Sequence, residues 1–307
     1  MSDQAADPLP TLFAATVVVV AGKGGVGKTT VTAVLARAAA DAGQRVLAVE
    51  LDGKPMLAEL LPGVEVRSIT AADALDEYLR EHGFKRVAKR LASSGVIDVI
   101  GTAAPGIDDI VVLGKIKQLE RSGEWDLIVV DGPAAGHAIT FLTSAQGMLD
   151  SVRGGPVHAQ ARDVMELLSD AQRCHVVLVT LPEATPVNEA IETIATLEGR
   201  VGVRLGPIVI NEVDNRTDVP DPATLRLGRS TDASALRAAA VFRRSRRAMQ
   251  DAEIARLAEA VALPRVELVA LAVAGLDAAD VRTLAATLAP RSSPEHSSKR
   301  SSRTVTS

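Results

Sequence analysis

Short apolar runs and longer stretches with helical periodicity alternate along the chain. The apolar runs are rich in β-branched residues, as strands buried on both faces of a sheet are. They occupy 16–21, 45–51, 127–130, 176–181, 207–210 and 266–272. Helical patterns cover 28–43, 188–197, 234–262 and 278–288. This alternation predicts the α/β fold class, with a mostly parallel, doubly wound sheet.

Two stretches interrupt the alternation and predict helical insertions on one edge of the domain. The first, near 70–120, holds several amphipathic patterns and a loop-like segment at 101–106. The second, near 145–172, contains a Gly-Gly-Pro turn followed by a helical pattern over 159–168. We expect one domain over 11–290, preceded by a flexible N-terminus at 1–10. The basic, Ser-rich tail at 291–307 has a composition that predicts disorder.

The composition narrows the class of protein. Hydrophobic residues make up 47% and charged residues 23% of the 307 positions, as is typical of globular proteins. Aromatic residues make up only 2%, so the core must consist mainly of Ala, Val, Leu and Ile. The net charge of −4 argues against a general nucleic-acid-binding protein.

The single cysteine and the apolar segments limit the chemistry and the location. Cys174 precedes an apolar run and is expected to be a small core residue. One cysteine excludes an intramolecular disulfide and a zinc site built on paired cysteines within the chain. No apolar segment reaches the ~18–20 residues that a membrane span needs. The N-terminus is acidic, unlike a signal peptide, so we expect a cytoplasmic protein.

A glycine-rich loop lies between the first apolar run and the first helical pattern. It comprises Gly22, Lys23, Gly24, Gly25, Val26, Gly27, Lys28, Thr29 and Thr30. The loop satisfies G-x-G-x-x-G, and Glu50 and Asp52 end the next strand roughly where a dinucleotide-binding fold has its ribose-binding carboxylate. It also satisfies the more demanding P-loop pattern G-x-x-x-x-G-K-[ST]. In that pattern backbone N–H groups wrap the phosphates, Lys28 neutralises the outer phosphates and the Thr29 hydroxyl binds Mg²⁺.

A carboxylate after another buried strand favours the P-loop interpretation. P-loop enzymes hold the magnesium shell with an acidic residue at the end of such a strand. Asp131 follows the apolar run at 127–130, and the nearby Gly136 is placed to offer its N–H to a γ-phosphate. An isolated Asp after a strand is more often a turn residue. Combined with the loop, however, it favours an enzyme that binds ATP and Mg²⁺ over a dehydrogenase.

Several segments resemble one group of P-loop enzymes. Residues 23–29, Lys-Gly-Gly-Val-Gly-Lys-Thr, resemble the deviant Walker A motif of the MinD/ParA/ArsA group. Residues 131–137, Asp-Gly-Pro-Ala-Ala-Gly-His, resemble switch II of its ArsA branch, which includes the tail-anchored-protein targeting ATPases. The segment 181–189 and the strand that ends at Asn211 are similar to the same branch. The resemblance covers about 15–290 and is closest to bacterial ArsA-like anion-transporting ATPases.

The resemblance implies roles for individual residues. Lys23, the signature lysine, would reach across a dimer interface and neutralise charge on the partner's nucleotide, while Lys28 acts in its own loop. Asn211 would hydrogen-bond the adenine, and Asp52 would orient or deprotonate the attacking water. The branch usually continues Asp-Pro-Ala-His, whereas this chain has Asp-Gly-Lys-Pro at 52–55. Asp52 can therefore be a turn residue instead, and Glu50 is a second candidate for the catalytic carboxylate.

The resemblance also implies an ATP-driven switch that works as a homodimer, or as a heterodimer with a paralogous ATPase, and acts on a protein client. One cysteine cannot capture arsenite through several thiolates or form a C-x-x-C zinc site between subunits. Two alternative functions stay open. The first is an ATP-binding scaffold or regulatory module with little hydrolysis, because the segment at Asp52 is altered. The second is a ParA/MinD-like positioning ATPase. This alternative depends on a cluster of arginines on a predicted helix: Arg243, Arg244, Arg246 and Arg247. A solvated helix face is the simpler interpretation of this cluster. The tail lacks the apolar face that a membrane-anchoring helix needs.

Overall fold

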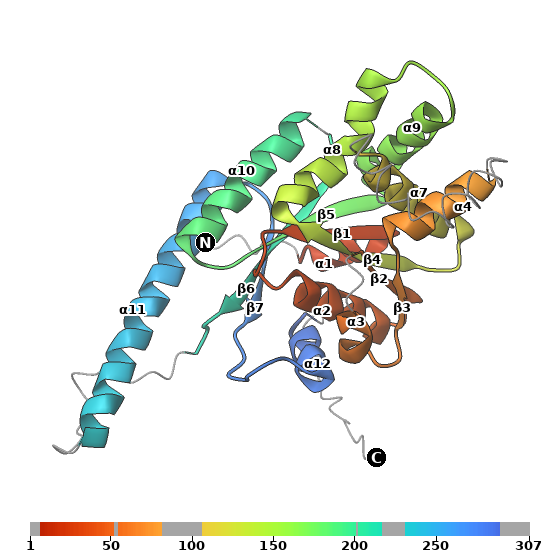
Figure 1. Ribbon diagram of the computed structural model, residues 1–307. Helices are drawn as coiled ribbons and strands as arrows, with labels where there is room; N and C mark the ends of the chain where they lie inside the picture. The colour runs from red at the N-terminus through yellow and green to blue at the C-terminus, as the bar shows by residue number, and fades with distance from the viewer. Residues whose placement is uncertain (1–6, 52–54, 82–105, 201, 217–230, 289–307) are drawn as a thin grey trace, which may run out of the picture.

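The computed structural model describes residues 7–51, 55–81, 106–200, 202–216 and 231–288. Within these ranges a seven-stranded sheet forms the centre of the molecule, in the order β3-β2-β4-β1-β5-β6-β7 (Figure 1). Every neighbouring pair of strands is parallel, which confirms the predicted fold class. The strands are β1 (Val17–Gly22), β2 (Val46–Glu50), β3 (Glu65–Ser68), β4 (Leu127–Ala134), β5 (Cys174–Thr180), β6 (Leu205–Val213) and β7 (Arg265–Val269).

Helices cover both faces of the sheet (Figure 1). One face carries α1 (Leu9–Ala14), α2 (Lys28–Asp41), α3 (Met56–Leu60) and α12 (Ala278–Thr287). The other carries α4 (Ala71–Glu81), α7 (Ile107–Ser122), α8 (Ala135–Ser151), α9 (Pro156–Ser169) and α10 (Ala184–Arg200). The longest of the described helices, α11 (Thr231–Ala260), runs beside α10, and its N-terminal half extends away from the sheet (Figure 1).

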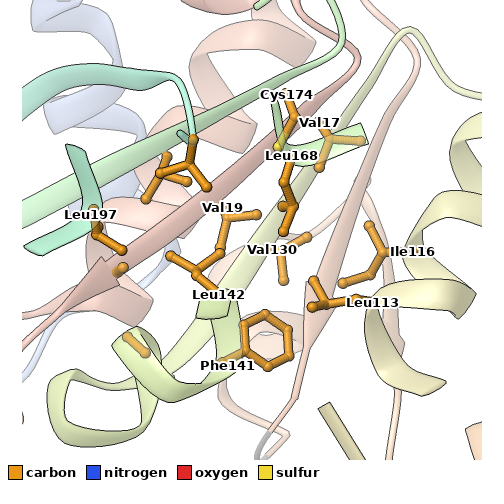
Figure 2. Close-up of a cluster of buried hydrophobic side chains, with 14 of the residues drawn as sticks. Val17, Val19, Leu113, Ile116, Val130, Phe141, Leu142, Leu168, Cys174 and Leu197 are labelled. Carbon is orange, nitrogen blue, oxygen red and sulfur yellow. The ribbon is translucent and has the colours of Figure 1, made fainter. Parts of the chain in front are cut away.

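The central strand shows why the sequence folds into three layers. Successive side chains of a strand point to opposite faces, so a run of apolar residues is buried on both. Val17 and Val19 of β1 belong to one apolar cluster, whereas Val18 and Val20 belong to the other, together with α2. Figure 2 shows part of the first cluster, in which β1 and β4 pack against α7, α8 and α9. The residues shown include Val17, Val19, Leu113, Phe141, Leu142, Val130 and Leu168.

Cys174 lies in this first cluster and is fully buried. Burial disfavours the thiolate and raises the pKa of the Cys174 thiol to about 12. The residue is therefore a core residue, as the sequence predicts, and its burial keeps the thiol protonated at neutral pH.

Four of the described elements lie wholly or mostly outside the sequence predictions: α1, β3, the short helix α3, and α8 before residue 145. Leu9 and Pro10, assigned above to a flexible N-terminus, lie in α1, because Leu9 and Leu12 are buried against the sheet. Asp7 supports the start of this helix by accepting a hydrogen bond from the Leu9 N–H at 3.0 Å. The second unpredicted element is β3, which pairs with β2 but has a largely polar sequence.

Each predicted apolar run overlaps a strand, although the run at 266–272 continues past the end of β7 at Val269, and the predicted insertions contain α4, α7 and α9. The second insertion begins inside α8, which continues directly from β4. The tail at 291–307, and most of the loop-like segment at 101–106, lie outside the described residues. Among the described helices, none has the length and apolarity required to cross a membrane.

Candidate functional site

The glycine-rich loop lies at the carboxyl edge of the sheet, between the end of β1 and the start of α2. The connection from β1 to β2 passes over one face of the sheet through α2. The connection from β4 to β5 passes over the other face through α8. Parallel sheets bind ligands where the direction of winding reverses in this way. Gly22 and Gly27 are required by the geometry of the loop. A Cβ at Gly22 would lie 2.6 Å from the Val179 carbonyl oxygen, and Gly27 has a φ of 86°.

The hydroxyl and the carboxylate for which the sequence predicts metal binding meet beside this loop. Thr29 Oγ1 in the first turn of α2 donates a hydrogen bond of 2.7 Å to Asp131 Oδ2 in β4. Thr32 Oγ1, one turn further along α2, donates to the other carboxylate oxygen at 3.4 Å. Hydroxyl and carboxylate oxygens are the hard donors that Mg²⁺ prefers, so the predicted pair fits a magnesium shell completed by phosphates and water. Thr32 was not predicted as part of the site.

The two loop lysines are directed to different partners. Lys28 is half-buried, and its Nζ donates to the backbone carbonyl oxygen of Lys23 at 3.3 Å, within its own loop. Lys28 also begins α2, whose N-terminal N–H groups favour a bound anion. Lys23 is exposed, and its Nζ forms an ion pair with Glu189 in α10. Glu189 lies in the segment 181–189 that resembles the ArsA branch, but no sequence pattern indicates that it pairs with Lys23.

The buried amide of Asn211 contacts the loop itself. Its Nδ2 donates to the Val26 carbonyl oxygen at 3.0 Å, although Asn211 comes from β6, two strands away from β1. The adenine contact that the resemblance implies for Asn211 stays a prediction.

Of the two candidate catalytic carboxylates, Glu50 and Asp52, the structure describes only Glu50. Glu50 ends β2 directly opposite Asp131, and it is 5% exposed. Its Oε1 accepts a hydrogen bond from the Leu57 N–H at 2.7 Å, so it holds α3 at the edge of the site. Asp52 lies outside the described residues. Gly136 lies in the first turn of α8, immediately after the end of β4.

The fold and this site define the class of protein. A buried parallel strand, a glycine loop, a helix that begins with lysine and threonine, and a carboxylate on the neighbouring strand are the parts of a P-loop nucleotide-binding site. The dinucleotide-binding alternative requires neither the lysine nor the hydroxyl–carboxylate pair.

Comparison with known proteins identifies the family. The family model of the anion-transporting ATPases matches residues 15–154, which include the loop and Asp131. ATPase BagA of Mycobacterium tuberculosis is 32% identical over 293 residues, which cover 81% of this chain and 85% of that protein. The arsenical pump-driving ATPase of Escherichia coli is 31% identical over 209 residues, which cover 66% of this chain and 35% of that protein. The chain belongs to the ArsA-like family of ATPases.

Proposed function

We propose that this protein hydrolyses ATP in a Mg²⁺-dependent reaction at the loop 22–30. The observation that carries the proposal is the hydrogen bond between Thr29 and Asp131, which joins two oxygen ligands beside Lys28 and the N-terminus of α2. The loop N–H groups would bind the phosphates, and Lys28 would neutralise charge on the outer ones. Thr29 and Asp131 would hold Mg²⁺, which would supply positive charge to neutralise the charge that develops on the phosphates. Gly136 would add a backbone donor, and Asp52 would orient the attacking water.

Removal of the metal ion tests this proposal directly. We expect the purified protein to release phosphate from ATP in the presence of Mg²⁺. EDTA should lower the rate by about 10²-fold or more, because the metal supplies several kcal/mol of charge stabilisation. Excess MgCl₂ should then restore the rate. A rate that EDTA leaves unchanged would contradict the proposal. Tight ATP binding without turnover would instead favour the scaffold alternative.

We further propose that the protein acts as a dimer, formed by two copies or with a paralogous ATPase. In this arrangement Lys23 serves the partner's nucleotide. The ion pair with Glu189 of the same subunit would then hold Lys23 in the resting state and open when the dimer forms. Because both side chains are partly exposed, this pair is a modest barrier, typically worth ~0–1 kcal/mol.

Replacing Glu189 by Gln is therefore expected to favour the ATP-bound dimer by a few-fold, since ~1 kcal/mol corresponds to roughly fivefold. Light scattering across a concentration series with Mg²⁺-ATP measures the monomer–dimer equilibrium. Glu192→Gln is the matched control, because it removes the same charge one turn further along α10. A Glu189→Gln variant that dimerises as Glu192→Gln does, or more weakly, would show that the pair does not restrain Lys23.

Coupling to a protein client is part of the same proposal. The relative from Escherichia coli is named for driving an arsenical pump. For this chain we propose that ATP turnover acts on a protein client and not on arsenite, because the buried thiol of Cys174 cannot capture arsenite.

The positioning-ATPase alternative depends on the arginine cluster of α11. Two of these arginines bind the segment after β6. Arg243 donates to both carboxylate oxygens of Asp214 at 2.7 Å, and Arg247 donates to the Arg216 carbonyl oxygen at 2.6 Å. These contacts favour a structural role for both side chains over a DNA-binding face.

A further inference from the structure

Asn211 occupies an unusual position beneath the phosphate-binding loop. The residue is 5% exposed, and its Nδ2 donates to the Val26 carbonyl oxygen at 3.0 Å. A carbonyl oxygen can pair only with a donor, so the amide nitrogen, not its oxygen, faces the loop. A Cβ added at Gly27 would lie only 2.3 Å from the same nitrogen. The amide therefore fills the space that the missing side chain of Gly27 leaves.

The backbone around Asn211 is shaped to aim this amide at the loop. The register between β6 and β7 shifts between Ile210 and Val213, and Glu212 has a φ of 58°. Irregularities of this kind redirect a side chain next to a functional site. The buried amide of Gln250 in α11 holds the irregular segment. It donates to the Glu212 carbonyl oxygen at 3.3 Å and accepts from the Asp214 N–H at 3.0 Å.

We propose that Asn211 is a positioning residue that fixes the phosphate-binding loop through the Val26 carbonyl, independently of any contact with the base. The inference rests on the proposed function, since it assigns the loop to phosphate binding. A loop rich in glycine loses much conformational freedom when it orders around a ligand. Anchoring Val26 beforehand removes part of that cost, so phosphate affinity rises without a contact between Asn211 and the phosphates.

The first test needs no nucleotide. Amide hydrogen exchange of peptides covering 22–30 should be about tenfold faster in Asn211→Ala than in the wild-type protein, because the Val26 carbonyl loses its buried partner. Asn211→Asp, of nearly the same size, should have an equal or larger effect, since a carboxylate oxygen would face the carbonyl oxygen. Gln44→Ala is the matched control. Gln44 also donates an amide N–H to a backbone carbonyl, that of Phe13 at 2.8 Å, but at the opposite edge of the sheet.

The second test separates the loop from the base. Inorganic tripolyphosphate with Mg²⁺ has no base, and calorimetry measures its affinity alongside that of ATP. We expect both Asn211 variants to bind tripolyphosphate about tenfold more weakly, with a similar loss for ATP, while Gln44→Ala binds as the wild-type protein does.

Two results would decide against the proposals, and they are distinguishable. If ATP affinity falls while loop exchange and tripolyphosphate affinity stay at wild-type values, Asn211 serves only the base and the positioning role is wrong. If the wild-type protein binds neither ATP nor tripolyphosphate, the proposed function fails. The exchange comparison would then still show whether Asn211 fixes the loop.

Discussion

Replacement of Lys28 by alanine is expected to lower ATP turnover by about 10²–10³-fold, the typical effect of removing one donor that stabilises transition-state charge. ATP affinity should fall as well, because Lys28 lies in the loop and at the start of α2, where it would meet the phosphates in the ground state too. Steady-state phosphate release and calorimetric binding measure the two effects. Lys115→Ala is a matched control, since Lys115 pairs with Glu77 between α7 and α4. Turnover by Lys28→Ala within twofold of the wild-type rate would contradict the assignment of the site.

Replacement of Lys23 by alanine should give a different pattern. If Lys23 acts on the partner's nucleotide as an arginine finger does, its loss should lower turnover by ~10³–10⁵-fold. ATP affinity of the monomer should change little, because the Lys23 side chain leaves its own loop and pairs with α10. The same two assays, on the same preparations, separate binding from turnover. A parallel loss of ATP affinity and turnover in the monomer would place Lys23 in its own site.

The sequence predicted the parts of the site that are local. A β-branched run, a glycine loop and a helix follow one another within 17–41, so their order alone specifies a strand, an anion-binding loop and a helix N-terminus. Asp131 could be predicted because parallel strands end at the same edge of a sheet, which brings its carboxylate to Thr29. In both cases chain order and the geometry of a parallel sheet contain the information.

The missed contacts are non-local. Lys23 and Glu189 are 166 positions apart, and Val26 and Asn211 are 185 positions apart. No periodicity connects residues at such separations. The direction of the Asn211 side chain also depends on the backbone irregularity at Glu212, which has no simple sequence signal because that residue is not glycine.

Two of the unpredicted elements were missed for a different reason. In the part of the chain that the structure describes, the edge strand β3 pairs with β2 alone, so the residues of Glu65–Ser68 remain partly exposed and need not be apolar. Helix α1 has only Leu9 and Leu12 as buried anchors, too few for a recognisable helical pattern.

In the dimer that we propose, each nucleotide site combines Lys28 of one subunit with Lys23 of the other. Mixing the two variants with low turnover, Lys23→Ala and Lys28→Ala, and measuring the rate of phosphate release tests this arrangement. In a mixed dimer, the Lys23→Ala subunit keeps an intact Lys28 and receives Lys23 from the other subunit. We expect an equal mixture to recover up to roughly a quarter of the wild-type rate, since about half of the dimers are mixed and each mixed dimer has one complete site out of two. A mixture that stays as inactive as its two components would show that Lys23 does not complete the site of the other subunit.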